Sequence, residues 1–286
     1  MLADSAGCGI EGKVCHRPFA IGHPLPAMAE ISPSFVATVA FLFGAAIGSF
    51  LNVCIYRLPI HESIVFPASH CRVCSTPLAW YDNLPLLSYL LRRGRCRFCQ
   101  TPFSFRYFLV ELVTALLAVV LVRRFGLTIT TVGYFAFSAA LVVITFIDLD
   151  HQIIPDAVSL SGAVAGVVFS LVSPALSLWS SLIGLVVGAG VLLAVALGYR
   201  MMTGREGMGG GDVKLLAMIG AFLGWRAVPF TLFAASFIGS IVGVTTMVRS
   251  KADSKLALPF GPFLSFGALG YLFFGERLIA WYLNLL

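Results

Sequence analysis

Gly209-Gly210-Gly211-Asp212-Val213-Lys214 lies between two apolar runs, at 182–199 and 213–225, and places a carboxylate at the edge of a hydrophobic segment. Ionisable groups at membrane depth are costly and usually mark a functional site. Glycines allow another backbone to approach closely. The alternative is a flexible loop in which Asp212 caps the next helix, because Asp is a favoured N-cap residue. A second carboxylate, Asp148, ends another apolar run and strengthens the functional interpretation.

The amino-acid composition indicates that this protein lies in a membrane. Of its 286 residues, 59% are hydrophobic and only 11% are charged. A soluble protein of this length would expose more charge, so the lipid bilayer is the expected surrounding. Long apolar runs favour helices over barrel strands. We therefore expect an all-α polytopic membrane protein. Its net charge of +6 reflects membrane topology and does not indicate a nucleic-acid partner.

About eight transmembrane helices are predicted from the apolar runs. The sixth run is shorter than the about 20 residues that a span needs, which suggests a shallow, tilted or broken helix. Residues 276–286 have the pattern of an amphipathic tail, with Trp281 and Tyr282 suited to the membrane interface. The predicted spans are 35–56, 107–122, 130–147, 157–172, 178–199, 212–225, 228–248 and 258–275.

The order of apolar and polar segments divides the chain into four parts. Residues 1–34 lack periodicity, and we interpret them as an N-terminal extension that is disordered or a start-site artefact, with Met28 as the natural start. Residues 35–56 are the first transmembrane helix. Residues 57–106 form a polar loop, and residues 107–286 form the remaining membrane core.

The basic residues predict the orientation. If the 57–106 loop is cytoplasmic, alternation of the spans places thirteen Lys and Arg residues inside and four outside, apart from Lys13 and Arg17 in the extension. This distribution agrees with the positive-inside rule. Asp148 and Asp212 then both lie at the cytoplasmic side of the membrane.

The polar loop carries a metal-binding pattern. Cys71-x-x-Cys74 and Cys96-x-x-Cys99 are separated by 21 residues, a spacing typical of zinc ribbons. Four thiolates close a tetrahedral site, so the Zn²⁺ would be structural rather than catalytic. A 50-residue loop buries little core, and metal binding would supply much of its folding free energy. The alternatives are four unrelated thiols or two disulfides, which a reducing cytoplasm disfavours.

Taken together, these motifs resemble those of a known family, the bacterial prepilin peptidases. Members of this family are type IV leader peptidase/N-methyltransferases of the GxGD aspartyl type. The similarity runs from about Phe35 to Gly275 and includes both Cys-x-x-Cys pairs. A single GGGD motif would be weak, but the ordered set is specific. The other matching motifs are Gly48-Ser49-Phe50-Leu51-Asn52-Val53, Arg57-Leu58-Pro59, Asn83-Leu84-Pro85, Arg93-Gly94-Arg95-Cys96, Arg106-Tyr107 with Glu111, Ile147-Asp148, Ile154-Pro155-Asp156, the Gly209 to Lys214 segment, and Pro259-Phe260-Gly261-Pro262.

The resemblance implies two activities. One cleaves the short basic leader from type IV prepilins and related pseudopilins at the cytoplasmic face of the bacterial inner membrane. The other methylates the new N-terminal residue with S-adenosyl-L-methionine as donor. The family motifs place the catalytic pair on Asp148 and Asp212. They also imply that the cysteine loop belongs to the bifunctional form.

The methyl-donor site has no familiar signature, since no glycine-rich motif of soluble methyltransferases is present. Gly94, beside the second cysteine pair, and Glu111, at the start of the next span, are candidates for this region. For Glu111 the alternative is an ion pair with one of the loop arginines. Methyl transfer to an amine requires a positioned, deprotonated amine and a bound donor, and we expect it not to use the aspartates.

Two other classes compete with a peptidase. A proton- or cation-coupled transporter would also use intramembrane carboxylates, although no internal repeat is evident. A zinc-stabilised assembly factor would carry out no chemistry. Within the peptidase interpretation, Asp150 and Asp156 are expected to be noncatalytic, and Asp156 follows Pro155 where it could cap a helix. We interpret His151 as a loop residue.

Overall fold

The computed structural model describes residues 32–67, 69–71, 73–77, 79, 84–204, 209–250 and 258–284. Most of the predicted N-terminal extension, including Met28, lies outside these residues. Among the described residues the chain is helical, and the strand-like pairing consists of two isolated bridges in the cysteine loop. The predicted all-α class is confirmed.

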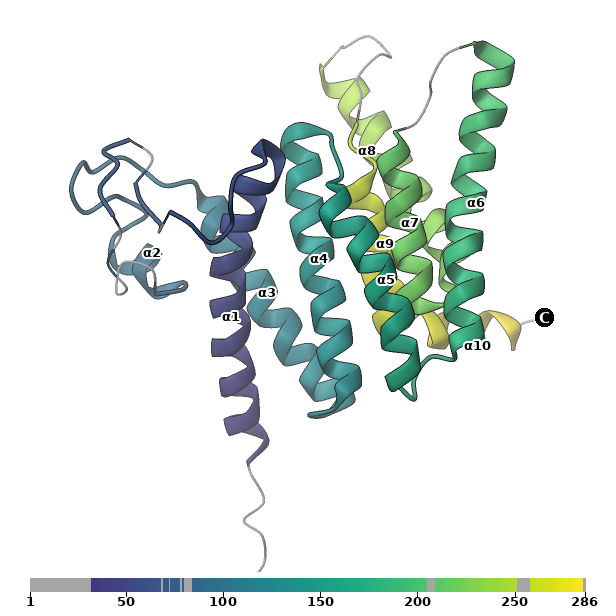
Figure 1. The fold of residues 1–286 in the computed structure, drawn as a ribbon, viewed down its shortest axis with the longest axis horizontal. Helices are drawn as coiled ribbons and strands as arrows, with labels where there is room; N and C mark the ends of the chain where they lie inside the picture. Colours follow the sequence, from purple (N-terminus) through teal and green to yellow (C-terminus); the bar gives the residue numbers. More distant parts are fainter. Residues whose placement is uncertain are drawn as a thin grey trace, which may run out of the picture.

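Eight apolar helices occupy the positions predicted from the sequence (Figure 1). Five helical segments are long and apolar enough to cross a membrane, and they contain α1, α3, α4, α6 and α8. The protein is therefore an integral membrane protein. The helices are α1 (Pro33–Arg57), α3 (Phe105–Phe125), α4 (Ile129–His151), α5 (Asp156–Val172), α6 (Leu178–Thr203), α7 (Gly210–Leu223), α8 (Ala227–Ser250) and α9 (Gly261–Gly270), with α9 continued by a π-helical turn at Tyr271–Gly275.

The sixth predicted span, α7, is as short as expected, with 14 residues. At 1.5 Å per residue such a helix reaches about 21 Å, less than the about 30 Å of a bilayer core. Every residue from Leu215 to Leu223 is buried, because α7 packs against α5, α6, α8 and α9. A helix enclosed by protein does not have to match the lipid thickness.

The main core is built around α4 and α7. Phe137 of α4 stacks on Phe222 of α7, with ring centroids 4.8 Å apart. Leu141, Ile144 and Met218 are fully buried in the same cluster. A second, smaller cluster joins α1 and α3 to the other face of α4. Helix α4 thus lies between the α1–α3 pair and the remaining helices (Figure 1).

One end of the bundle collects the polar features, and we call it the carboxylate end because Asp148 and Asp212 lie there. Figure 1 shows this end at the top, where α4 turns into α5, α7 begins, and the cysteine loop flanks α1. The loop contains the short helix α2 (Leu87–Leu91).

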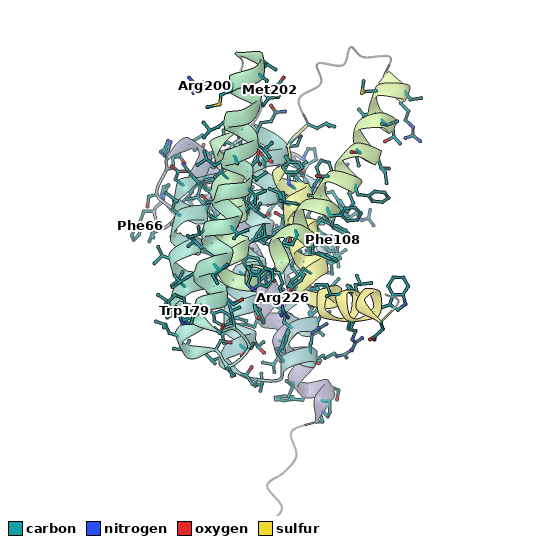
Figure 2. The ribbon with its side chains drawn as sticks, turned by 90° about the vertical axis from the view of Figure 1, so that its right-hand side faces the viewer. Phe66, Phe108, Trp179, Arg200, Met202 and Arg226 are labelled. Carbon is teal, nitrogen blue, oxygen red and sulfur yellow. The ribbon has the colours of Figure 1, made fainter. Side chains whose placement is uncertain are left out.

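The opposite end carries interfacial residues. Helix α10 (Glu276–Leu283) lies across the bundle axis there, near the labelled Arg226, and Trp179 marks the same end (Figure 2). Trp179 and Trp281 are exposed, as expected for aromatic side chains at a membrane interface. The side chain of Tyr282, the second predicted interfacial aromatic residue, is outside the described part.

Helices α6 and α7 pack closely because glycines lie at their contact. Replacing one of these glycines with a larger residue should therefore lower the stability of the protein. A methyl group at Gly220 would overlap the carbonyl oxygen of Gly184, a backbone atom that cannot rotate away. We expect Gly220→Ala to cost at least about 1–3 kcal/mol and lower the melting temperature in detergent. Gly190→Ala on α6, where a methyl group meets nothing within 4 Å, is the control and should melt like the wild type or higher. Equal melting of both variants would contradict this packing.

Candidate active site and cysteine cluster

Asp148 is the buried carboxylate of the carboxylate end. It lies in the last turn of α4 and is 5% exposed. Its Oδ2 atom accepts a hydrogen bond of 2.9 Å from the backbone N–H of Gly261, the first residue of α9. A side chain at Gly261 would be crowded, because a Cβ atom there would lie 2.7 Å from Oδ2 of Asp148. The Pro259-Phe260-Gly261-Pro262 motif thus brings a glycine N–H to this carboxylate.

Asp212 lies in the first turn of α7 and is partly buried. The alternative interpretation, in which Asp212 caps the helix, is wrong: the N-cap residue is Gly209, and no side chain caps this end. The surroundings of Asp212 and Asp148 meet at Ile154, because the Ile154 Cδ1 atom would lie 3.4 Å from a Cβ atom at Gly261, the hydrogen-bond partner of Asp148. Gly211 packs on Ile154, where a Cβ atom would come within 2.9 Å of the Ile154 Cβ. The α4 and α7 ends therefore place the two predicted aspartates in the same region of the carboxylate end.

Asp150 and Asp156, the two noncatalytic candidates, have cationic partners. Asp150 pairs with Arg106, which also donates a 2.6 Å hydrogen bond to the carbonyl of Phe146. Asp156 lies 2.6 Å from the Nζ atom of Lys214. Its predicted role as a helix cap is wrong, because Pro155 is the N-cap residue and the Asp156 side chain reaches α7 instead.

The four aspartates therefore fall into two groups that differ in their charged neighbours. In the part of the chain that the structure describes, Asp148 and Asp212 take part in no ion pair, while Asp150 and Asp156 each do. Carboxylates without a neutralising cation differ from the usual structural ion pair, and they are the kind of group expected at a functional site.

The contact between Gly261 and Asp148 gives a specific prediction. Gly261→Ala would push on the Oδ2 atom of Asp148 and weaken its backbone hydrogen bond. We expect at least about a tenfold loss of any activity that depends on Asp148, because small displacements of reacting groups carry such costs. Gly198→Ala, at an open position on α6, is the matched control and should retain activity. Initial rates at matched protein levels measure this, and equal rates for both variants would remove Gly261 from the site.

The four cysteines of the loop converge on one point. The sulfur atoms of Cys71, Cys74, Cys96 and Cys99 all lie within 4.8 Å of one another. Cys71 and Cys99 are 3.7 Å apart, and Cys74 and Cys96 are 3.9 Å apart. A zinc tetrahedron with Zn–S bonds of about 2.3 Å has sulfur–sulfur edges of about 3.8 Å. The residues fit a zinc ion. All four thiols are free, so the disulfide alternative finds no support.

The two cysteine pairs form the same local turn. In each, the N–H of the first cysteine bonds to a threonine carbonyl, and its carbonyl accepts from the residue after the second cysteine. These following residues, Ser75 and Gln100, have φ values of 54° and 57°. The hydroxyl group and backbone of Thr101 lower the pKa of the Cys99 thiol to about 6, which favours the thiolate that binds metal.

Gly94 and Glu111, the two candidates for the methyl-donor region, line one pocket of about 340 Å³. Gly94 has φ +65° and packs against Tyr89, so a Cβ atom would come 2.8 Å from the ring. Glu111 is buried, and its Oε2 atom accepts a 2.7 Å hydrogen bond from the N–H of Leu86. The described contacts thus do not include the expected pairing of Glu111 with an arginine.

Three residues of this region were missed as site residues in the sequence. Gly261, Arg57 and Arg106 all belong to the family motifs, but the sequence alone gives them no role. Arg57 is buried and donates hydrogen bonds to the carbonyls of Ser63 and Pro67. The sequence does not indicate that Arg57, at the end of an apolar helix, is buried. The loop that covers it comes from later in the chain and folds back over it.

Fold and site define a polytopic membrane protein with paired aspartates at its helix ends and a four-cysteine loop. Two family models match the chain, the Bacterial Peptidase A24 N-terminal domain at residues 42–125 and the Type IV leader peptidase family at residues 135–244. The first match includes the cysteines and the second includes both aspartates. The chain belongs to the type IV leader peptidase family. The resemblance inferred from the motifs is confirmed.

Several curated relatives are similar over most of the chain. The prepilin leader peptidase/N-methyltransferase of Aeromonas hydrophila is 37% identical over 276 residues, covering 88% of this chain and 95% of the relative. That of Pseudomonas putida is 36% identical, covering 90% and 96%. That of Myxococcus xanthus is 42% identical, covering 75% and 64%. No solved structure matches significantly. Nothing in these comparisons supports the transporter alternative.

Proposed function

We propose that this protein removes the leader peptide from type IV prepilins and related pseudopilins and methylates the new N-terminal residue. The relatives named for both activities, which align over most of the chain, support this assignment. The observation that carries the cleavage activity is the placement of buried Asp148 and partly buried Asp212 at the same end of the bundle, on either side of Ile154, without a neutralising cation among the described residues.

Cleavage proceeds through one aspartate dyad. Two neighbouring carboxylates do not both ionise comfortably, so the pair holds one shared proton. The ionised member takes a proton from a water molecule, and this water attacks the scissile carbonyl carbon. The protonated member donates its proton to the leaving amine as the peptide bond breaks. The Gly261 N–H orients Asp148 for this exchange.

The substrate enters along the membrane. Its hydrophobic helix stays in the bilayer, and its basic leader projects from the carboxylate end. Gly209 and Gly210 expose backbone without side chains at the start of α7, which leaves room for an extended peptide beside Asp212.

We assign the carboxylate end to the cytoplasmic side of the bacterial inner membrane. The distribution of Lys and Arg along the chain supports this orientation. Residues 57–106 then form a cytoplasmic loop held by one structural Zn²⁺, and residues 107–286 form the peptidase core after the first transmembrane helix. The basic residues of the loop either contact anionic lipid headgroups or serve topology alone. Methylation uses S-adenosylmethionine as the donor of the methyl group.

A single assay tests both activities. The purified protein is incubated in detergent or lipid with a synthetic prepilin and S-adenosylmethionine, and mass spectrometry follows leader release and the mass gain of one methyl group. We expect leader release without the donor, and methylation only of the cleaved product. Absence of leader release by folded, zinc-loaded protein on several prepilins would contradict the proposed function.

A further inference from the structure

We propose that the pocket between α1, α3 and the cysteine loop binds S-adenosylmethionine, with Arg57 holding its carboxylate, and that a neighbouring apolar cavity receives the N-terminal side chain of the pilin. This assignment rests on the proposed function. The described residues that line the pocket all lie within residues 49–111, and none of them belongs to α4, α7 or α9. The donor site is therefore distinct from the aspartate pair.

The pocket has the size and composition of a small-molecule site. Its volume of about 340 Å³ lies within the range of about 300–1,000 Å³ for ligand pockets. Among the described residues, four aromatic side chains line it, and aromatic faces suit both a flat base and a sulfonium cation. Carboxylates and arginines are also present. The aromatic residues are Tyr56, Tyr89, Phe103 and Tyr107, and the charged residues are Arg57, Glu62, Arg92, Arg95 and Glu111.

Arg57 provides the strongest argument for a ligand with a carboxylate. Its side chain is 6% exposed, and its guanidinium group donates to two neutral carbonyl oxygens, those of Ser63 and Pro67. Within the described residues it has no carboxylate partner. A buried cation without an anion is costly, and a carboxylate entering the pocket would neutralise it through a charge-assisted pair.

Glu111, which also lines the pocket, complements the charge of Arg57. It is buried on α3, and the Leu86 N–H holds its side chain in place. A fixed carboxylate lining the pocket suits the cationic part of the ligand, the ammonium group or the sulfonium centre. S-Adenosylmethionine carries a carboxylate, two cationic groups and an aromatic base, which matches the charges and rings of this pocket.

A second cavity of about 360 Å³ adjoins the first and shares Ser49, Val53, Arg57 and Ser69 with it. Its remaining lining is mostly apolar and includes Ala46 and Phe50, which are exposed on α1. An apolar cavity beside a membrane helix suits the hydrophobic N-terminal residue of a cleaved pilin. The deprotonated pilin amine would then attack the methyl carbon, the carbon–sulfur bond would break with its electron pair on sulfur, and the product ammonium would release a proton to water.

Donor binding tests the first half of the proposal. Titration calorimetry with S-adenosylmethionine on the full-length, zinc-loaded protein should show at least about a tenfold weaker Kd for Arg57→Gln. Arg97→Gln is the matched control, since Arg97 is an exposed arginine of the same loop outside the pocket, and it should bind like the wild type. Unchanged affinity of Arg57→Gln would overturn the assignment.

If Arg57→Gln does not fold, an experiment on the wild-type protein tests the same donor pocket. A photoreactive azidoadenosyl analogue of the donor, competed by S-adenosylmethionine, should label peptides within residues 49–111. Competed labelling confined to α4, α7 or α9 would refute the pocket. The proposed function fails separately, if the folded, zinc-loaded wild-type protein releases no leader from several prepilins.

Blocking the second cavity tests the acceptor half. Ala46→Phe should raise the KM for cleaved pilin in methylation several-fold while the donor Kd stays unchanged. Leu42→Phe, at an exposed position one turn earlier on α1 and outside the cavity, is the control. A normal pilin KM for Ala46→Phe would exclude this cavity as the acceptor site.

Discussion

Asparagine at Asp148 or at Asp212 will abolish leader cleavage, lowering kcat by at least about 10³-fold. Asparagine keeps the shape of the side chain but can neither take a proton from water nor give one to the leaving amine. Both members of the dyad are needed, so each single variant should lose activity to a similar extent. Leader release from a synthetic prepilin at matched protein levels measures this.

The two neighbouring aspartates are the internal controls. Asp150→Asn removes the pair with Arg106, and Asp156→Asn removes the exposed pair with Lys214. Such pairs contribute about 0–1 kcal/mol, so both variants should keep a substantial part of the cleavage rate. Robust cleavage by Asp148→Asn or Asp212→Asn would end the dyad proposal, whatever the behaviour of the controls.

Loss of zinc will unfold the cysteine loop. The four thiols form one tetrahedral cluster, and structural zinc in small domains contributes about 10–16 kcal/mol of apparent binding free energy. We expect Cys96→Ser to lose the metal, to expose residues 57–106 to proteolysis, and to abolish donor binding, because Cys71 and Arg95 form part of the pocket wall.

Metal content and limited proteolysis of the purified protein measure this effect. Cys54→Ala is the matched control, since Cys54 is a buried thiol of α1 outside the cluster and should leave one zinc ion per chain. A fresh, reduced and active wild-type protein without zinc would refute the metal assignment.

The fold was largely predictable because apolar runs determine membrane helices directly. The short α7 was recognised from its length, and its enclosure by neighbouring helices explains why it needs no full span. The aspartate pair was predicted from the family motifs, and both residues lie at helix ends on the same side of the bundle. The cysteine cluster followed from spacing alone, since two local turns repeat the same backbone geometry.

The partners of these residues were not predictable, because they come from distant parts of the chain. Gly261 reaches Asp148 across 113 residues of sequence, and Lys214 reaches Asp156 across 58. The latter contact is the reason that the predicted Asp156 cap is wrong. The burial of Arg57 was also hidden, because the segment that covers it is a loop without periodicity.

The most direct test of the account uses Asp212→Asn with two substrates, an intact prepilin and an already cleaved pilin. The prepilin should remain uncleaved, while the cleaved pilin should be methylated at a rate close to that of the wild type, because the donor pocket contains no residue of α7. Loss of both activities in a folded, zinc-loaded variant would contradict two separate sites, and retained cleavage would contradict the aspartate dyad itself.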